Sequence, residues 1–476
     1  MALCTKTRPR LRRRRQSLWR LDENHRGTPP QIEFTDGPAA DQRSGEDEYY
    51  FLSPGYEDDA EPDHGAGIYD ADGELVWMQP ADREGEDNFF YVRVQSYLGQ
   101  PVLTYYRGPN YAWGNAEITV LDETYDRIAN VTTGGEVGPQ RADFHYTTIT
   151  DRWTMLLISY YPTPMDLSAV GGPADGWVLD GRIQEIDIAT GVVVFGWAAA
   201  DHVPAEHTSQ EIAADDHAMG TEGAPFDWFH LNSITEDDDG NLILLARNTH
   251  AIYKLDKQTG ALVWTLGDRA SDFQMGEGTD FAWQHDTQRA YDGAVTLLDN
   301  HVYLDDAESG DSRGLRLALD DEAMTAGVAQ QYDPPLQRPA GSLANVQEID
   351  VGTVVIGWGQ EPYFSEYTHD GELILDASHG GDGSNRAYRF PWDGRPTTEP
   401  DVAVQDGSVF VSWNGATEVA QWRVVASDDE GSAEPVETEG RDGFETEIPL
   451  EQDAAYVAVE ALDENGQVLA TGTPQD

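Results

Sequence analysis

Apolar and polar residues alternate in short runs along most of this chain, a pattern that predicts β-strands rather than helices. One pattern recurs: an alternating strand that ends in Asp or Thr, then a turn, then a second strand. Its six copies are anchored at Tyr69-Asp70, Leu121-Asp122, Ile186-Asp187, Leu255-Asp256, Leu319-Asp320 and Tyr367-Thr368. The second and fifth copies lack the clean Xaa-Gly turn that favours a tight hairpin, so they are the weaker ones. The repeat indicates one small β unit used several times.

A second recurring element lies between these hairpins and consists of a strand, a turn and a strongly apolar strand. Its copies are Val92–Tyr106, Phe144–Tyr160, Phe229–Arg247, Gln284–Asn300 and Asn345–Trp358, with a short version at Tyr49–Leu52. Each unit then supplies about four strands, and four-stranded units repeated radially make a β-propeller. We therefore predict an all-β fold with a six-bladed β-propeller. A solenoid is the alternative, but its units are usually shorter and more uniform.

The composition changes after the sixth unit, where Pro391, Pro396 and Pro400 mark a linker. Beyond it the strands alternate as in a small β-sandwich. The run from Gly407 to Trp413, with Tyr456 later, resembles a fibronectin type III domain. We predict a basic, disordered arm at residues 1–30, the propeller at 31–397 and a fibronectin type III-like sandwich at 401–476. Spacing, docking or stabilisation of the propeller is the expected role of the sandwich.

The chain is strongly acidic, with 87 acidic and 30 basic residues, a formal net charge of −57 and an isoelectric point near 4.2. A polyanionic binding surface or a set of calcium sites is one interpretation. We favour the surface of a halophilic protein, because the acids are spread along the whole chain among the aromatic residues of a folded domain. In molar salt a Debye length of about 3 Å screens their repulsion. Nucleic acid is not expected as a partner.

Cysteine content and targeting signals leave the location of the protein open. Cys4 is the only cysteine, so no intrachain disulfide is possible. No apolar run reaches the roughly 18–20 residues of a membrane span. The run from Arg8 to Arg15 resembles a basic signal n-region, but no apolar h-region follows it. We expect a soluble protein of a halophilic organism, with export or the cell surface as one alternative for its location.

Histidine recurs at one place in the second element. The segments Phe144–Ile149, Phe229–Ile234 and Gln284–Arg289 align on His145, His230 and His285, and Asn345 takes that place in the last unit. The first strand of each blade borders the central channel, so these three imidazoles are expected to face one cavity. Arg247 ends the apolar strand next to that of His230, which puts it at the mouth of the channel. The structural alternative is that duplicated blades share these residues for packing.

Three histidines and an arginine suit two kinds of chemistry. Imidazoles are good ligands for zinc or copper, and ligands from separate blades would show no local motif. Alternatively, arginine offers a fork of donors to sulfuryl or phosphoryl oxygens, while one histidine attacks and another protonates a leaving oxygen. No phosphate-binding loop, nucleophile elbow or dinucleotide fingerprint competes with these interpretations.

Four motifs carry a resemblance to the arylsulfate sulfotransferase family over residues of about 45–395. They are Asp227–Ile234, Ala246–Ile252, Val263–Gly267 and Trp283–Asp286. The resemblance implies a six-bladed propeller that moves a sulfuryl group from a phenolic sulfate ester to a phenol. It also implies a ping-pong reaction through a sulfated histidine, with no nucleotide sulfate donor. The chain departs from well-known bacterial members because it lacks a disulfide and an evident signal peptide and carries a C-terminal sandwich.

Carried over by motif, the resemblance makes His285 the nucleophile. It implies that His230 and Arg247 bind the sulfuryl oxygens, and that His145 assists in oxygen binding or proton transfer. Trp228, Phe229, Trp283 and Asn345 are the candidate substrate-binding residues, with core packing as the alternative for the three aromatic ones.

The expected partners are a small aryl sulfate donor and a phenolic acceptor, with no cofactor and no metal. Oligomeric state stays open. The alternatives are a non-catalytic ligand- or protein-binding propeller at the cell surface, or a histidine-ligated metalloenzyme.

Overall fold

The structure is a computed structural model that describes residues 30–474, apart from residues 46, 56–63, 82–87, 213–217, 303–311, 350–351, 382, 429 and 451–453. The arm predicted at residues 1–30 therefore lies almost wholly outside the described residues. Strands dominate the described part, and its helices are six short 3-10 turns. The turns are η1 (Ala40–Gln42), η2 (Ser168–Val170), η3 (Ala199–Asp201), η4 (Ala205–His207), η5 (Arg247–Thr249) and η6 (Glu430–Ser432). The predicted all-β fold class is confirmed.

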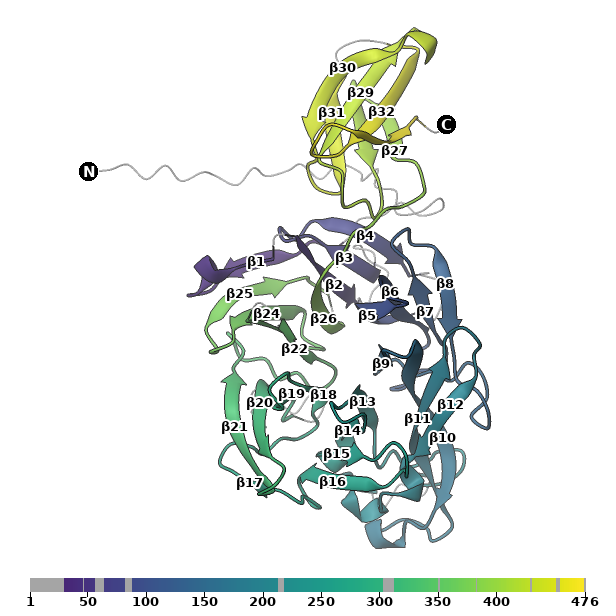
Figure 1. The fold of residues 1–476 in the computed structure, drawn as a ribbon, viewed down its shortest axis with the longest axis vertical. Coiled ribbons are helices and arrows are strands. Elements are labelled where there is room, and N and C mark those ends of the chain that lie inside the picture. Colours follow the sequence, from purple (N-terminus) through teal and green to yellow (C-terminus); the bar gives the residue numbers. More distant parts are fainter. Residues whose placement is uncertain are drawn as a thin grey trace, which may run out of the picture.

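Six sheets of four or five strands stand around a common centre in the described part of residues 33–391 (Figure 1). We call them blades 1 to 6 in the order of the chain and give their strands from the centre outward. Blade 1 is β26 (Ser384–Pro391), β2 (Glu48–Pro54), β3 (Gly65–Tyr69) and β4 (Leu75–Pro80). Blade 2 is β5 (Asn88–Tyr97), β6 (Gln100–Gly108), β7 (Glu117–Leu121) and β8 (Arg127–Val131). Blade 3 is β9 (Thr147–Ile149), β10 (Thr154–Met165), β11 (Gly176–Asp187) and β12 (Val193–Ala198).

The second half of the ring repeats this plan with an added outer strand on two of its sheets. Blade 4 is β13 (Leu231–Glu236), β14 (Leu242–Ala246), β15 (Ala251–Leu255) and β16 (Leu262–Gly267). Blade 5 is β18 (His285–Arg289), β19 (Val295–Asp299), β20 (Arg313–Asp320), β21 (Thr325–Tyr332) and β17 (Gln274–Met275). Blade 6 is β22 (Asn345–Ile349), β23 (Thr353–Gly357), β24 (Tyr363–Thr368), β25 (Leu373–Ser378) and β1 (Glu33–Asp36).

The repeated patterns of the sequence correspond to fixed places in these sheets. The six predicted hairpins are the third and fourth strands of each blade, and each anchor residue pair ends the third strand. The predicted second element is the inner pair of strands in blades 2 to 6. The second strand of this pair is strongly apolar because neighbouring sheets cover both of its faces. β14, β19 and β23, for example, are buried at every position.

Strands from the two ends of residues 33–391 close the ring of blades. The innermost strands contact one another in sequence from β5 to β22, and β26 contacts both β22 and β5. β26 pairs with β2 inside blade 1, while β1 pairs with β25 at the outer edge of blade 6. Neither pairing was predicted from the sequence. The segment Ser384–Pro391 contains Asn and two Arg, which suit a loop unless tertiary partners are known; Arg389, for example, pairs with Glu48 and Glu366.

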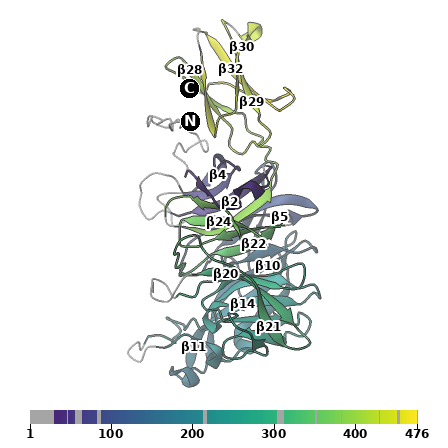
Figure 2. The same cartoon turned by 90° about the vertical axis from the view of Figure 1, so that its left-hand side faces the viewer.

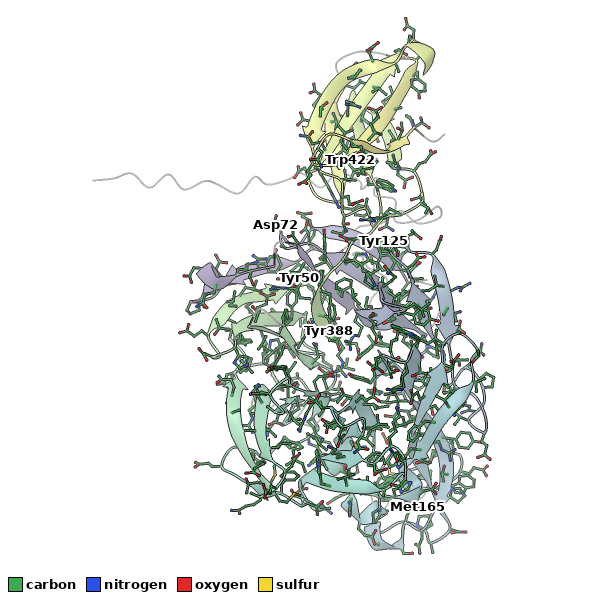
Figure 3. All side chains as sticks on the ribbon, viewed as in Figure 1. Tyr50, Asp72, Tyr125, Met165, Tyr388 and Trp422 are labelled. Carbon is green, nitrogen blue, oxygen red and sulfur yellow. The ribbon has the colours of Figure 1, made fainter. Side chains whose placement is uncertain are left out.

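A second set of strands forms two facing sheets beyond the ring. One sheet holds β27 (Asp401–Gln405), β28 (Ser408–Ser412) and β31 (Glu445–Pro449). The other holds β30 (Glu434–Gly440), β29 (Gln421–Ser427), β32 (Tyr456–Leu462) and β33 (Val468–Gly472). Their shared core contains the buried Trp422, which is labelled in Figure 3. This sandwich sits at one end of the molecule, beside blade 1 (Figures 1 and 2).

Specific contacts join the sandwich to blades 1 and 2. The Tyr125 ring stacks on Trp77, with ring centroids 5.1 Å apart, and its hydroxyl donates to the Gly415 carbonyl over 2.9 Å. The Asn414 side chain pairs with the backbone of Met78 in both directions. Gly415 has a φ of 96°, and a Cβ placed on it would overlap the Tyr125 ring. Glycine is therefore required there for two reasons, backbone conformation and close approach.

Replacing Gly415 by alanine is expected to lower the unfolding free energy by more than the same change at Gly407. Gly407 also has a left-handed φ, 80°, but nothing lies within 4 Å of an added Cβ. Gly407→Ala therefore reports the conformational cost alone, about 1–2 kcal/mol. Gly415→Ala adds the clash at the junction. Denaturant titration of both variants checks this, and equal losses would contradict the tight junction.

Among the described residues, no helix has the length and apolar character needed to cross a membrane.

Candidate functional site

A pocket of about 510 Å³ collects four of the residues singled out from the sequence. His145, His230, His285 and Arg247 all contribute to its lining. The three histidines come from blades 3, 4 and 5, at the points where the innermost strands begin. Arg247 directly follows β14, the second strand of blade 4. The ring architecture thus brings together side chains that are up to 140 positions apart in the sequence.

His285 is buried and held by an amide. Its Nδ1 lies 2.7 Å from Asn300 Oδ1. Asn300 Nδ2 donates to the carbonyls of Ala340 and Leu343, so the amide oxygen must be the atom that faces the imidazole. Nδ1 of His285 therefore carries the proton, and Nε2 carries the lone pair. Burial, with the positive charges of Arg247 and Arg386, holds the pKa of His285 well below its usual value.

His145 and His230 are held by carboxylates instead. Nδ1 of His145 lies 2.7 Å from Asp143 Oδ1, and Nδ1 of His230 lies 2.6 Å from Asp227 Oδ2. The two rings stand edge to face, with centroids 4.9 Å apart. Burial lowers the pKa of His145, although the Asp143 carboxylate opposes this. The three histidines therefore differ in the group that holds Nδ1, an amide for His285 and a carboxylate for the other two.

The register of the inner strands corrects the alignment of His230. The turn after the innermost strand opens at Thr150, Asp237 and Ala290 in blades 3, 4 and 5, where each N–H donates to the carbonyl four residues on. His145 and His285 precede that turn residue by five positions, but His230 precedes it by seven. Asn232 is therefore the true counterpart of the other two histidines. His230 lies just before β13 and has a left-handed φ of 51°, and in this position it still lines the pocket.

Arg247 is buried and fixed on several sides. Its Nη1 donates to Asn248 Oδ1 over 3.0 Å, and its Nη2 donates to the Gly341 carbonyl over 3.4 Å. The guanidinium lies over the Trp283 ring, 5.0 Å from the centroid. Trp283 does not line the pocket, so in this structure it supports the arginine. A fixed guanidinium beside a neutral imidazole is suited to hold an anionic group.

The other predicted substrate-binding residues lie inside the protein. Trp228 and Phe229 are fully buried in the apolar core of the ring, where their rings contact each other. Asn345 is also fully buried, and its side chain pairs with the backbone N–H and carbonyl of Ala387 in the closing strand β26. None of the three lines the pocket. Their positions suit packing and ring closure.

The residues that hold the site were not predicted from the sequence. Asp143 and Asp227 precede their histidines by two and three positions, a signal that was available in the segments Asp143–His145 and Asp227–His230. Asn300 directly follows β19, the place that Arg247 occupies after β14, so the repeat also pointed to it. Arg386 had no local signal. Its guanidinium donates to the carbonyls of Ala344 and His145 and lies 3.5 Å from Asp286.

A backbone segment covers Nε2 of His285. The Leu343 N–H donates to His285 Nε2 over 3.2 Å. Leu343 and the next residue, Ala344, both have left-handed φ values, 64° and 87°. Such conformations are uncommon outside glycine and cluster at functional sites. The lone pair of His285 is thus occupied by a hydrogen bond from a strained loop.

The histidines do not converge as a metal site would require. Within the described residues, no group of three or more His, Cys, Asp or Glu is placed to hold a metal ion. Each of the three imidazoles has its Nδ1 on a protein oxygen.

Comparisons with known proteins identify a family. A family model described as arylsulfotransferase (ASST) matches residues 93–380. No curated protein matches the chain.

Solved structures show only weak likenesses. A protein of unknown function from Bacteroides caccae is 12% identical, with 72% of this chain and 98% of that one covered and a TM-score of 0.42. A Lactobacillus plantarum protein is 14% identical, with 85% and 100% covered and a TM-score of 0.37. The Cps50 (Swd1) β-propeller domain of Myceliophteria thermophila is 12% identical, with 81% and 96% covered and a TM-score of 0.37. These likenesses are too weak to bear on function.

Proposed function

Because this chain belongs to the arylsulfotransferase (ASST) family, we propose that it moves a sulfuryl group from a phenolic sulfate ester to a phenolic acceptor through a sulfated His285. The observation that carries the proposal is a buried imidazole with a lowered pKa beside a buried arginine in a pocket lined by two further histidines. The first test is transfer itself. Purified protein in molar salt should release phenol from a chromogenic aryl sulfate and sulfate an added phenol.

The first half of the reaction forms a bond between nitrogen and sulfur. The Nε2 lone pair of His285 attacks the sulfur of the donor, and the bond from sulfur to the phenolic oxygen breaks. The electron pair of that bond leaves with the oxygen, which takes a proton. Arg247 faces the three other sulfuryl oxygens with a fork of donors, so it stabilises their charge during transfer. A phenol is a tolerable leaving group because its pKa is about 10.

Proton transfer falls to the histidines with carboxylate partners. His145 and His230 keep their Nδ1 protons on Asp143 and Asp227, which leaves Nε2 of each ring to exchange a proton with the phenolic oxygen. In the second half, the acceptor hydroxyl gives its proton to such a ring as its oxygen attacks the sulfur. The bond between sulfur and Nε2 then breaks, and neutral His285 is restored. One ring acts as acid in the first half and as base in the second.

Attack requires the hydrogen bond from the Leu343 N–H to give way. This bond is longer than the one from Nδ1 to Asn300, 3.2 Å against 2.7 Å. We propose that substrate binding moves this N–H from the lone pair of Nε2 toward a sulfuryl oxygen, where it would add a donor for the developing charge. Asn300 keeps the ring in place meanwhile.

Asn300→Asp is expected to make sulfation of His285 more sensitive to acid. The active form of His285 is neutral, and its lowered pKa keeps it neutral well below pH 6.5. A carboxylate in place of the amide favours the imidazolium, so the pKa rises and the acid limb of the rate profile moves to higher pH. The measurement is the rate of phenol release from a nitrophenyl sulfate across pH, because that donor needs little help from an acid. Asn300→Gln offers an uncharged control. An unchanged acid limb in Asn300→Asp would argue against the assigned role of Asn300.

We also propose that residues 31–397 and 401–476 are separate domains and that the second is a fibronectin type III-like sandwich. Its strand order supports this, since the first, second and fifth strands form one sheet and the other four form the second. The proposed role is to brace blades 1 and 2 from outside. The spread of acids over the chain supports a halophilic origin.

A further inference from the structure

A second pocket, of about 430 Å³, adjoins the pocket of the histidines. It is lined by Trp113, Arg141, Tyr160, Pro162, Met219 and Pro225, among others. Met219 lines both pockets. The Tyr160 ring also stands between them, with its centroid 6.2 Å from that of His145 and 5.9 Å from that of His230. A ring bound in the second pocket would therefore be separated from His145 and His230 by the Tyr160 ring alone.

The Asp143 carboxylate hydrogen-bonds both to His145 in the first pocket and to the backbone that forms a wall of the second pocket. Asp143 binds Nδ1 of His145 through Oδ1, and its Oδ2 accepts the N–H of Gly114 over 2.6 Å. Gly114 lies between Trp113 and Asn115, which both line the second pocket. The second pocket is thus built on the carboxylate that orients a site histidine.

Arg141 is the basic residue in the lining of this pocket. Most arginines of the chain whose side-chain contacts are described have a carboxylate partner; Arg182, for example, is 2.9 Å from Asp180. For Arg141, no ion pair with a carboxylate occurs among the described residues, although acids outnumber bases 87 to 30 in the chain. Its guanidinium lies over the Tyr161 ring, 5.4 Å from the centroid, and it is half-buried at the pocket. Glu222 is the acidic residue in the lining.

The lining also contains a polar atom without a partner. Asn115 Oδ1 is buried and has no hydrogen-bond donor among the described residues. Buried polar atoms are usually satisfied, so an acceptor left open in a pocket indicates a ligand or water that donates to it. Together with the aromatic walls, Arg141 describes a ligand with a ring and an anionic group, while Asn115 Oδ1 is an acceptor for a water or a further substituent that donates.

We propose that the second pocket binds the aryl group of the substrate and that Arg141 selects aryl groups that carry a carboxylate. This rests on the proposed function. Trp113 and Tyr160 supply ring surfaces, and the guanidinium fork matches a carboxylate with two parallel hydrogen bonds. The volume is within the range of small-molecule pockets. In a ping-pong reaction the leaving phenol and the entering phenol use the same space, so the preference applies to donor and acceptor alike.

The test compares two acceptors of nearly the same size and shape, the anionic 4-hydroxybenzoate and the neutral 4-hydroxybenzamide. Wild-type protein should favour the carboxylate in kcat/KM, and Arg141→Gln should reduce that preference about tenfold. The ratio between proteins cancels the difference in reactivity between the two phenols. Arg127→Gln removes the same charge from an exposed strand away from both pockets and should leave the preference unchanged. An unfolding midpoint near that of wild type shows that Arg141→Gln is folded.

Calorimetric binding of the same two phenols without any donor separates this proposal from the proposed function. Tighter binding of 4-hydroxybenzoate by wild type, lost in Arg141→Gln, supports the pocket even if no transfer occurs. Equal affinities in wild type, or a preference that Arg141→Gln retains, overturns it even if transfer is fast.

Discussion

Replacement of His285 by glutamine is expected to abolish both turnover and the covalent adduct. Glutamine approximates the size of the imidazole but has no nitrogen lone pair for attack on sulfur. Loss of a catalytic nucleophile typically lowers kcat by about 10⁴-fold or more. Incubation of wild-type protein with donor alone, followed by mass spectrometry, should show one added SO₃ group on a peptide that contains His285. The variant should show none.

A matched control distinguishes this effect from a general loss of histidine. His202 is exposed at blade 3 and stacks on Trp197, away from the pocket. His202→Gln should keep both turnover and the adduct. An adduct on another histidine would move the nucleophile, most directly to His230 or His145. Transfer without any adduct would mean direct displacement between donor and acceptor, and the ping-pong scheme would be wrong.

The repeated units of the fold were predictable because they depend on local physics. A period-two alternation with a turn every few residues specifies a hairpin wherever it occurs, and the anchors at Leu255-Asp256 and the other five units all end a strand. Closure of the ring was not predictable in the same way. β26 and β1 pair with strands more than 300 positions away, and their polar residues resemble a loop until those partners are known.

Only some of the site residues could be predicted from the repeats of the sequence. His145 and His285 occupy the same register, so repetition identified them together. His230 aligned by its neighbours but lies two residues out of register, which only the turn at Asp237 reveals. Trp228 and Phe229 looked like an aryl site because aromatic residues flank the histidine; the backbone instead turns both rings into the core.

Arg247→Lys is expected to lower kcat/KM by about 10²-fold while leaving the acid limb of the pH profile in place. Lysine keeps a positive charge but offers a single rotating ammonium instead of a fixed fork, so it cannot reach two sulfuryl oxygens at once. Loss of one preorganised donor typically costs about this much. Arg395→Lys, at an exposed arginine paired with Glu418, is the control for the general effect of this exchange. A variant with wild-type kcat/KM would remove Arg247 from the mechanism.

Arg247→Met separates two roles of the arginine, which are to stabilise the sulfuryl oxygens and to lower the pKa of His285. Its charge contributes, after burial, to the lowered pKa of His285. Removal of the charge should raise that pKa, so His285 becomes protonated at a higher pH and the acid limb moves upward, in addition to the loss of rate. Arg247→Lys should lose rate alone. If both variants kept the wild-type acid limb, burial and Arg386 would suffice to keep His285 neutral, and Arg247 would act only on the sulfuryl oxygens.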